Sequence, residues 1–237
     1  MKKIVTGAEK CPDSIFQQCA KLVPDAVILE GYGITECSPV VAANLVGNRK
    51  SGSVGKPVRS VEVCIVDVES GRPVSAHETG MLLVAGPSIF DGYYRHDGPS
   101  PFVEVDGKLW YKTGDLVSMD DDGFLLFQGR LKRFLKAGGE MISLPALEEP
   151  FARAFPPDEN GPKVAVEGME TEDGRHIVLF TTQDLSLRRA SEMLLESGLR
   201  GVMRLDEVRH IESVPVLGTG KTDYKELRRL LEESLKV

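Results

Sequence analysis

The chain has 237 residues, 41% of them hydrophobic and 27% charged, so it can fold around one large core or two smaller ones. Its net charge of −7 and pI near 5.3 argue against a nucleic-acid-binding surface, which needs basic residues gathered on one face. The four cysteines form no CxxC pair, the four histidines lack metal-ligand spacing, and no segment approaches membrane-spanning length. We therefore expect an intracellular protein without a metal cluster, a disulfide framework or a membrane span.

The first 50 residues predict a strand, a helix and a second strand. We place the first strand at Lys3 to Thr6, the helix at Pro12 to Val23 and the second strand at Ala26 to Glu30. Pro12 suits the first helical turn, and Pro24 ends the helix. Since such a βαβ unit needs neighbouring strands, we expect residues 1–50 to be the last part of a larger α/β sheet domain.

Residues 51–130 change to short apolar or alternating runs that are bounded by Gly, Pro and Asp. This pattern is typical of β-strands and predicts a β-rich, barrel-like subdomain. The four runs are VEVCIVDV, GMLLVAG, KLWYKTGDLVSM and GFLLFQG.

Residues 131–237 predict a separate, small α+β domain, with the boundary at Gly129 to Lys132. A charged segment from Arg130 to Lys136 opens it. The remaining pattern predicts both helices and strands. The predicted elements are a helix opened by Ser143 and Pro145, strands at Lys163 to Glu167 and His176 to Thr181, a helix at Ser186 to Ser197, and a last helix from Thr222.

Five stretches place polar side chains on tight glycine turns. Each alone is typical of an ordinary loop. Their order and spacing resemble the adenylate-forming superfamily, which includes the acyl-CoA synthetases, luciferases and peptide-synthetase adenylation domains. The stretches are TGAE (Thr6 to Glu9), GYGITECSP (Gly31 to Pro39), YKTGD (Tyr111 to Asp115), GRLKRFLKAGGE (Gly129 to Glu140) and PVLGTGK (Pro215 to Lys221).

The resemblance covers essentially the whole chain and implies an ATP-dependent reaction. In that family a carboxylic acid and ATP form an acyl-adenylate and pyrophosphate, and the acyl group then passes to a thiol. The implied fold is the tail of the large domain followed by a mobile C-terminal domain. The implied cofactors are ATP and Mg²⁺.

The GYGITE stretch fits nucleotide binding in physical terms. Tyr32 offers a flat ring for adenine, and Gly33 lets the backbone approach without a side-chain clash. Thr35 offers a hydroxyl to the α-phosphate, and Glu36 offers the carboxylate oxygen that Mg²⁺ prefers. A solvated charge at a strand end is the alternative for Glu36.

The resemblance implies nucleotide contacts at two further stretches. Asp115 matches the residue that receives the ribose hydroxyls, and Arg130 adds a donor at the domain junction. Asp115 could instead cap a β-turn, because Gly-Asp is common turn chemistry. The adenine edge would be met by Gly7, Ala8 and Glu9.

The resemblance also assigns roles in the C-terminal domain. Lys132 matches the hinge, where an exposed residue can absorb a change in backbone dihedrals, and Lys221 matches the catalytic lysine. The alternative for Lys132 and Lys136 is a solvated basic linker. The loop that would line the thiol entry contains Lys136, Gly138 and Gly139.

Two short features of the sequence point to other function classes. GTGKT at Gly218 to Thr222 resembles the end of a P-loop, but that motif needs glycine where Pro215 stands. A non-catalytic interaction module with the same fold stays open, because fold alone does not establish function. Lys221 argues against such a module unless it lies in a surface loop, where a lysine costs nothing.

Within the superfamily, GRLKRFLKAGGEMISL and PVLGTGKTDYKEL look most like the acyl-carrier-protein synthetase half of the bifunctional 2-acylglycerophosphoethanolamine acyltransferases. Ordinary CoA ligases tend to carry Asp after the hinge, where this chain has Arg133. The resemblance implies a long-chain fatty acid and the phosphopantetheine thiol of an acyl carrier protein, with CoA as the alternative. A basic surface for an acidic carrier protein would come from Arg188, Arg189, Arg200, Arg204 and Arg209.

The family's phosphate-binding loop and most of its acyl pocket have no counterpart in the chain. We therefore expect a fragment, the last two-fifths of such an enzyme, that does not form acyl-adenylate alone. The resemblance implies a cytoplasmic enzyme, whose complete form can associate with the cytoplasmic face of the inner membrane. Acyl length and any preceding acyltransferase domain stay open.

Overall fold

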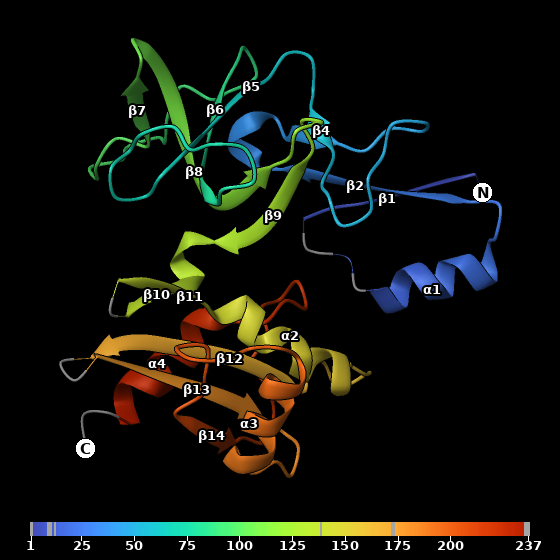
Figure 1. Ribbon diagram of the computed structural model, residues 1–237, viewed down its shortest axis with the longest axis vertical. Coiled ribbons are helices and arrows are strands. Elements are labelled where there is room, and N and C mark those ends of the chain that lie inside the picture. The colour runs from blue at the N-terminus through green and yellow to red at the C-terminus, as the bar shows by residue number, and fades with distance from the viewer. Residues whose placement is uncertain (1, 9–10, 12, 138, 172–173, 235–237) are drawn as a thin grey trace. The chain divides into compact units, whose positions relative to one another are not determined.

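The computed structural model describes residues 2–8, 11, 13–137, 139–171 and 174–234 (Figure 1). The chain divides into two compact units, Met1–Leu131 and Lys132–Val237. This division falls inside the boundary segment expected from the sequence, Gly129 to Lys132. Among the described residues, no helix is long and apolar enough to cross a membrane.

Unit 1 begins with a four-stranded sheet in the order β1-β2-β3-β4. As expected from the βαβ pattern, β1 runs parallel to β2, with Lys3 opposite Val27. Strand β2 extends beyond the predicted end at Glu30, because Gly31 and Tyr32 pair with β3. The elements are β1 (Lys3–Thr6), α1 (Asp13–Leu22), β2 (Val27–Gly33), a short 3-10 helix (Thr35–Cys37), β3 (Val40–Ala43) and β4 (Lys56–Pro57).

The rest of unit 1 is a five-stranded antiparallel sheet built on the long strand β8. Strand β6 pairs with one edge of β8, and β7 and β9 pair with the other edge, one after the other. The described strand pairs leave the sheet open at β5, so the structure does not show the barrel-like closure that the sequence suggested. The strands are β5 (Glu62–Val66), β6 (Gly80–Ala85), β7 (Phe102–Val105), β8 (Lys108–Met119) and β9 (Leu125–Arg130).

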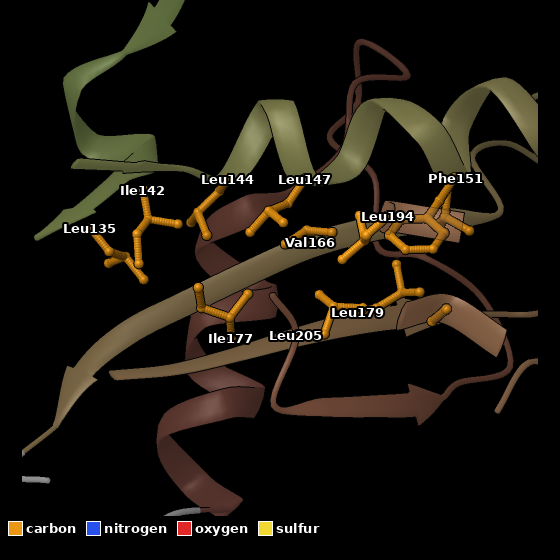
Figure 2. Packing of buried hydrophobic residues seen from close by; sticks show 12 residues of the cluster. Leu135, Ile142, Leu144, Leu147, Phe151, Val166, Ile177, Leu179, Leu194 and Leu205 are labelled. Atoms are coloured by element: carbon orange, nitrogen blue, oxygen red, sulfur yellow. The ribbon is translucent and has the colours of Figure 1, made fainter. Parts of the chain in front are cut away.

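Unit 2 is built on the three-stranded sheet β12-β13-β14, which has helices on both faces. Alternate residues of the strands face opposite sides, so Val166 packs toward α2 and α3, and Ala165 packs toward α4. Figure 2 shows the first of these cores, where α2 lies over β12 and β13. The elements are β10 (Phe134–Ala137), β11 (Glu140–Ser143), α2 (Leu144–Ala154), β12 (Val164–Thr171), β13 (Gly174–Thr181), α3 (Leu187–Glu196), β14 (Glu207–His210) and α4 (Tyr224–Ser234).

Side-chain caps start the three helices of unit 2 close to their predicted beginnings. The Ser143 hydroxyl accepts a hydrogen bond from the Ala146 N–H, and the Ser186 hydroxyl accepts one from Arg189. Asp223 accepts hydrogen bonds from the N–H groups of Lys225 and Glu226 at the start of α4. Local sequence therefore sets where these helices begin.

The segment after the unit boundary differs from the expected charged link. A 3-10 helix (Leu131–Arg133) leads directly into the β10–β11 hairpin, in which Leu135 pairs with Ile142 and both are buried. The hairpin was not predicted, since its two apolar residues are separated by the glycine-rich turn that looked like an open loop. Arg133, which lies in the segment expected to be a charged link, has a side chain only 13% exposed.

Candidate functional site

Two residues that were predicted to bind the nucleotide, Tyr32 and Asp115, are in direct contact in unit 1. The Tyr32 hydroxyl donates a hydrogen bond of 2.6 Å to Oδ2 of Asp115. Tyr32 lies at the end of β2, and Asp115 lies in the middle of β8, 83 residues later. The Asp115 N–H donates a hydrogen bond to the Thr113 hydroxyl, and this bond fixes the local backbone.

The second carboxylate oxygen of Asp115 is buried but not fully satisfied. Asp115 is only 1% exposed, and its Oδ1 accepts no hydrogen bond among the described residues. Nε of Arg130, which faces Asp115 across the β8–β9 ladder, lies 3.3 Å from Oδ1 as an ion pair without hydrogen-bond geometry. A buried carboxylate oxygen with unused acceptor capacity suits a ligand hydroxyl, so these residues fit the ribose of ATP.

Burial raises the pKa of Asp115 above its ordinary value, while the Tyr32 hydrogen bond and the Arg130 charge act in the opposite direction. Burial and the neighbouring Asp115 raise the pKa of Tyr32, so the phenol stays a hydrogen-bond donor at neutral pH. The contribution of Asp115 itself to stability is therefore largest below its unfolded pKa and is lost as pH rises through the folded pKa. The Tyr32 hydrogen bond offsets part of that loss.

We expect Tyr32→Phe to lower the free energy of unfolding of unit 1 by about 2 kcal/mol at pH 7, because the buried carboxylate loses its donor. The deficit should shrink as pH falls through the raised pKa of Asp115, since the protonated carboxyl no longer needs that donor. Urea unfolding followed by the single tryptophan, Trp110 on β8, measures it at pH 7 and about pH 4. Tyr94→Phe, at a tyrosine 86% exposed, is the control. An equal deficit at both pH values would contradict the assignment.

The predicted metal ligand Glu36 is held by a tyrosine that the sequence did not single out. The Tyr93 hydroxyl donates a hydrogen bond of 2.8 Å to Oε1 of Glu36 and lies 3.2 Å from the Tyr111 hydroxyl. Burial raises the pKa of Tyr111, so its phenol remains protonated beside the carboxylate. The negative charge of Glu36 also raises the pKa of Asp115, which places the two carboxyl groups in one electrostatic neighbourhood.

Glu36 fits Mg²⁺ as a single carboxylate ligand only. No group of three or more His, Cys, Asp or Glu side chains that could hold a metal occurs within the described part of the chain. Mg²⁺ keeps several waters and is commonly bound by one or two carboxylates together with substrate phosphates. Glu36 can therefore hold the ion only together with a bound nucleotide, with no preformed cage.

The predicted glycines are needed for backbone packing. A Cβ on Gly33 would lie 2.1 Å from the Pro39 carbonyl oxygen, and one on Gly7 would lie 3.0 Å from the Gly31 carbonyl oxygen. The TGAE stretch therefore lies against the GYG stretch, where Ala8 takes a positive φ of 68°. Thr35 is exposed in the 3-10 helix that follows. Glu9 lies outside the described residues.

The tyrosine proposed to stack on adenine is itself packed in the protein core. Tyr32 is 9% exposed, and its ring centroid lies 5.9 Å from that of Phe127. Its hydrogen bond to Asp115 makes it a support for that carboxylate. Stacking on adenine stays a prediction.

The remaining predicted residues lie in unit 2. Lys132 is its first residue and is exposed, and Lys136 lies on β10, with its N–H donating to Glu170. Gly139 has a φ of +87°, which favours glycine in the β10–β11 turn, and Gly138 lies outside the described residues. Lys221 is exposed on a loop that is closed by a hydrogen bond from the Leu217 N–H to the Lys221 carbonyl.

The expected basic surface for a carrier protein is largely neutralised. Arg188 and Arg189 pair with Glu192 on the same helix, and Arg209 pairs with Glu207. These carboxylates were overlooked because the arginines were read without their helical i, i+3 and i, i+4 neighbours. The charge pattern therefore gives no support to a carrier-protein surface at α3.

Cys37 lies next to Glu36, yet it is a poor nucleophile. It is fully buried, and burial together with the Glu36 charge raises the pKa of its thiol to about 11. Because the thiolate is the reactive form, Cys37 is excluded as an acyl acceptor at neutral pH.

Three supporting residues escaped sequence reasoning. Tyr93, Tyr111 and Thr113 hold Glu36 and Asp115 in place. Two of them lie inside the quoted YKTGD stretch, so its tyrosine and threonine could have been assigned supporting roles. The GYY at residues 92–94 carried no comparable signal, because exposed tyrosines occur in many loops.

The family model described as "AMP-binding enzyme" matches residues 1–94. A long-chain-fatty-acid–CoA ligase of Yersinia pestis is 33% identical over 214 residues, 89% of this chain and 36% of that protein. The ligase of the same name from Bacillus subtilis is 35% identical over 150 residues, 63% of this chain and 26% of its own length. The 4-coumarate–CoA ligase-like 2 of Arabidopsis thaliana is 26% identical over 98% of this chain and 41% of its own.

Solved structures share the fold. The anthranilate CoA ligase AuaEII in complex with anthranoyl-AMP has a TM-score of 0.77 at 23% identity, over 100% of this chain and 45% of that one. The Bacillus subtilis o-succinylbenzoate CoA synthetase in complex with ATP and magnesium ion has a TM-score of 0.77 at 23% identity, over 96% of this chain and 46% of that one. The chain thus spans less than half the length of these relatives. Over that part, the chain is similar to the AMP-binding, adenylate-forming enzymes and to the acyl-CoA ligases among them.

Proposed function

We propose that this chain is the nucleotide-binding and C-terminal part of an ATP-dependent ligase that joins a long-chain fatty acid to a phosphopantetheine thiol. The carrying observation is the buried Asp115 carboxylate, whose Oδ2 is held by Tyr32 while Oδ1 keeps unused acceptor capacity. Such an oxygen is costly in a protein that binds nothing there, and it is explained by a ribose hydroxyl. By "complete ligase" we mean this chain together with the further part that its relatives have.

The proposed roles follow from the side-chain chemistry. Asp115 and Arg130 orient the ribose, and the Thr35 hydroxyl donates a hydrogen bond to an oxygen of the α-phosphate. In the first half-reaction a carboxylate oxygen attacks the α-phosphorus as the bond to pyrophosphate breaks, and Lys221 supplies positive charge between the two approaching anions. Mg²⁺, held by Glu36 and phosphate oxygens, would offset the phosphate charge when bound.

The acceptor thiol is proposed from sequence similarity. The GRLKRFLKAGGEMISL stretch favours an acyl carrier protein, as in the acyl-carrier-protein synthetases that it resembles. CoA is the second candidate, because both bacterial relatives described above are named long-chain-fatty-acid–CoA ligases. Both acceptors end in the same phosphopantetheine arm. A cytoplasmic location stays a prediction.

The test is ATP–pyrophosphate exchange by the complete ligase with a long-chain fatty acid, followed by detection of the thioester. We expect exchange that depends on the fatty acid, and acyl transfer to holo-carrier protein ahead of CoA. The apo-carrier protein, which lacks the arm, is the control. Exchange that is independent of any carboxylic acid would overturn the ligase function, and faster transfer to CoA would overturn the carrier-protein assignment alone.

A further inference from the structure

Arg133, directly after the unit boundary, is a buried cation held from three sides. Its Nη2 lies 3.2 Å from Oε2 of Glu148 and donates a hydrogen bond of 3.0 Å to the Val166 carbonyl. The guanidinium carbon lies 3.5 Å from the centroid of the Tyr224 ring. Burying an arginine is costly unless its surroundings replace water, and these contacts do so on most sides.

Glu148 on α2 is the centre of this cluster. Its Oε1 accepts a hydrogen bond of 2.7 Å from the Tyr224 hydroxyl, and its Oε2 accepts one of 2.7 Å from the Val166 N–H in addition to the contact with Arg133. One carboxylate therefore joins the boundary segment, β12 and α4. Burial lowers the pKa of Arg133, but Glu148 and Tyr224 outweigh it, so the net shift is upward and the cation persists.

Tyr224 connects the cluster to the loop that carries Lys221. It is the first residue of α4 and follows Lys221 by three positions. The loop is closed at its base by the hydrogen bond from the Asp223 N–H to the Pro215 carbonyl and by the bridge between Val216 and Thr222. Because the base is closed, we expect the loop to move together with the start of α4.

One atom of the cluster is left over. Nε of Arg133 is buried and has no acceptor among the described residues. A purely structural core position is usually filled more cheaply by an apolar residue, and an unsatisfied buried donor needs an explanation. A role for the cation is indicated by its contact with the Tyr224 ring, which connects the boundary segment to the start of α4.

We propose that Arg133, Glu148 and Tyr224 are positioning residues that couple the segment at the unit boundary to the loop carrying Lys221. Movement of Lys132 and Arg133 then shifts the Tyr224 ring, and with it the base of that loop. The importance of the coupling rests on the proposed function, because Lys221 has a catalytic task only there. The coupling itself is a property of unit 2 and can be measured without substrates.

Amide hydrogen exchange of the 237-residue chain tests it through the amides of Leu217, Gly220 and Asp223, whose hydrogen bonds close the loop. Tyr224→Phe keeps the ring and removes the donor to Glu148, and Arg133→Gln removes the cation. Each should speed exchange of the loop amides roughly tenfold, the scale for one hydrogen bond to a charged group. Because both act through one cluster, the double variant should exceed the larger single effect by little.

The matched control is Arg175→Gln. Arg175 has a side chain 8% exposed and pairs with Asp206 in the same unit, without a contact to the cluster in the described hydrogen bonds and ion pairs. It should change exchange in the core strands and leave the loop amides unchanged. Equal loop effects in all three variants, or fully additive effects of Arg133→Gln and Tyr224→Phe, would overturn the coupling.

A second measurement separates this inference from the proposed function. In the complete ligase, Tyr224→Phe should lower kcat for adenylate formation several-fold, with the KM for ATP unchanged, because Lys221 is misplaced while the ribose site in unit 1 is intact. An unchanged kcat combined with faster loop exchange would overturn the catalytic importance of Lys221 and leave the coupling standing.

Discussion

Lys221→Ala in the complete ligase is expected to lower the rate of acyl-adenylate formation about a hundredfold or more, the scale for losing one preorganised charge-stabilising donor. In that step two anions approach each other, and negative charge gathers on the oxygens between them. Lys221 offers a compact ammonium, and it directly follows Gly220 on an exposed loop that also contains Gly218, so the adjoining backbone can enter a crowded site without a side-chain clash. Fatty-acid-dependent ATP–pyrophosphate exchange measures this rate.

Thiol transfer from supplied acyl-adenylate should be largely spared in the same variant. The resemblance to the adenylate-forming enzymes implies that the mobile domain presents the loop around Lys136 and Gly139 in that step and withdraws Lys221. Lys225→Ala is the matched control, because Lys225 is exposed on α4 four residues away. Equal loss in both half-reactions, or loss in neither, would show that Lys221 is structural or simply exposed.

Asp115→Asn is expected to weaken AMP binding by the 237-residue chain about thirtyfold to a hundredfold. The substitution keeps the shape and leaves an oxygen that can accept from Tyr32, but it removes the charge that strengthens hydrogen bonds from two ribose hydroxyls. Each such bond contributes about 1 kcal/mol beyond a neutral one. Calorimetric titration with AMP gives the ratio of dissociation constants.

The ligand supplies the control for this prediction. Dideoxy-AMP, which lacks both ribose hydroxyls, should bind wild-type chain and variant with similar weak affinity. A thirtyfold loss that appears equally with the dideoxy compound would mean that Asp115→Asn has disturbed unit 1 as a whole and that Asp115 does not receive the ribose.

Local chemistry made much of the fold predictable. The strands β1, β6 and β9 follow from apolar runs bounded by glycine or polar residues, and α2 and α3 begin at serine caps that the sequence displays. The order of the glycine-containing stretches also pointed to Tyr32 and Asp115. Tyr32 and Asp115 are 83 positions apart in the sequence, yet they contact each other. Their proximity was predictable because both stretches were expected to line the same ligand.

What escaped prediction depends on contacts between distant elements. The burial of Arg133 was not predicted, since Glu148 and Tyr224, which contact it, lie 15 and 91 positions away in the sequence. Tyr93 gave no signal of its contact with Glu36. The sheet around β8 stays open because β5 pairs only with β6, and composition does not encode which strands pair. Hydrophobic periodicity and capping residues predict the helices and strands, whereas the contacts between residues far apart in the sequence are known only from the structure.

The central claim is that unit 1 binds an adenine nucleotide where Tyr32, Glu36 and Asp115 meet, and AMP titration followed by backbone amide resonances tests it most directly. We predict saturable shifts at Gly7, Gly33, Thr35 and Asp115, and none in the core strands of unit 2, β12 and β13. Saturable shifts confined to unit 2, or no shift at any AMP concentration up to the millimolar range, would contradict the claim.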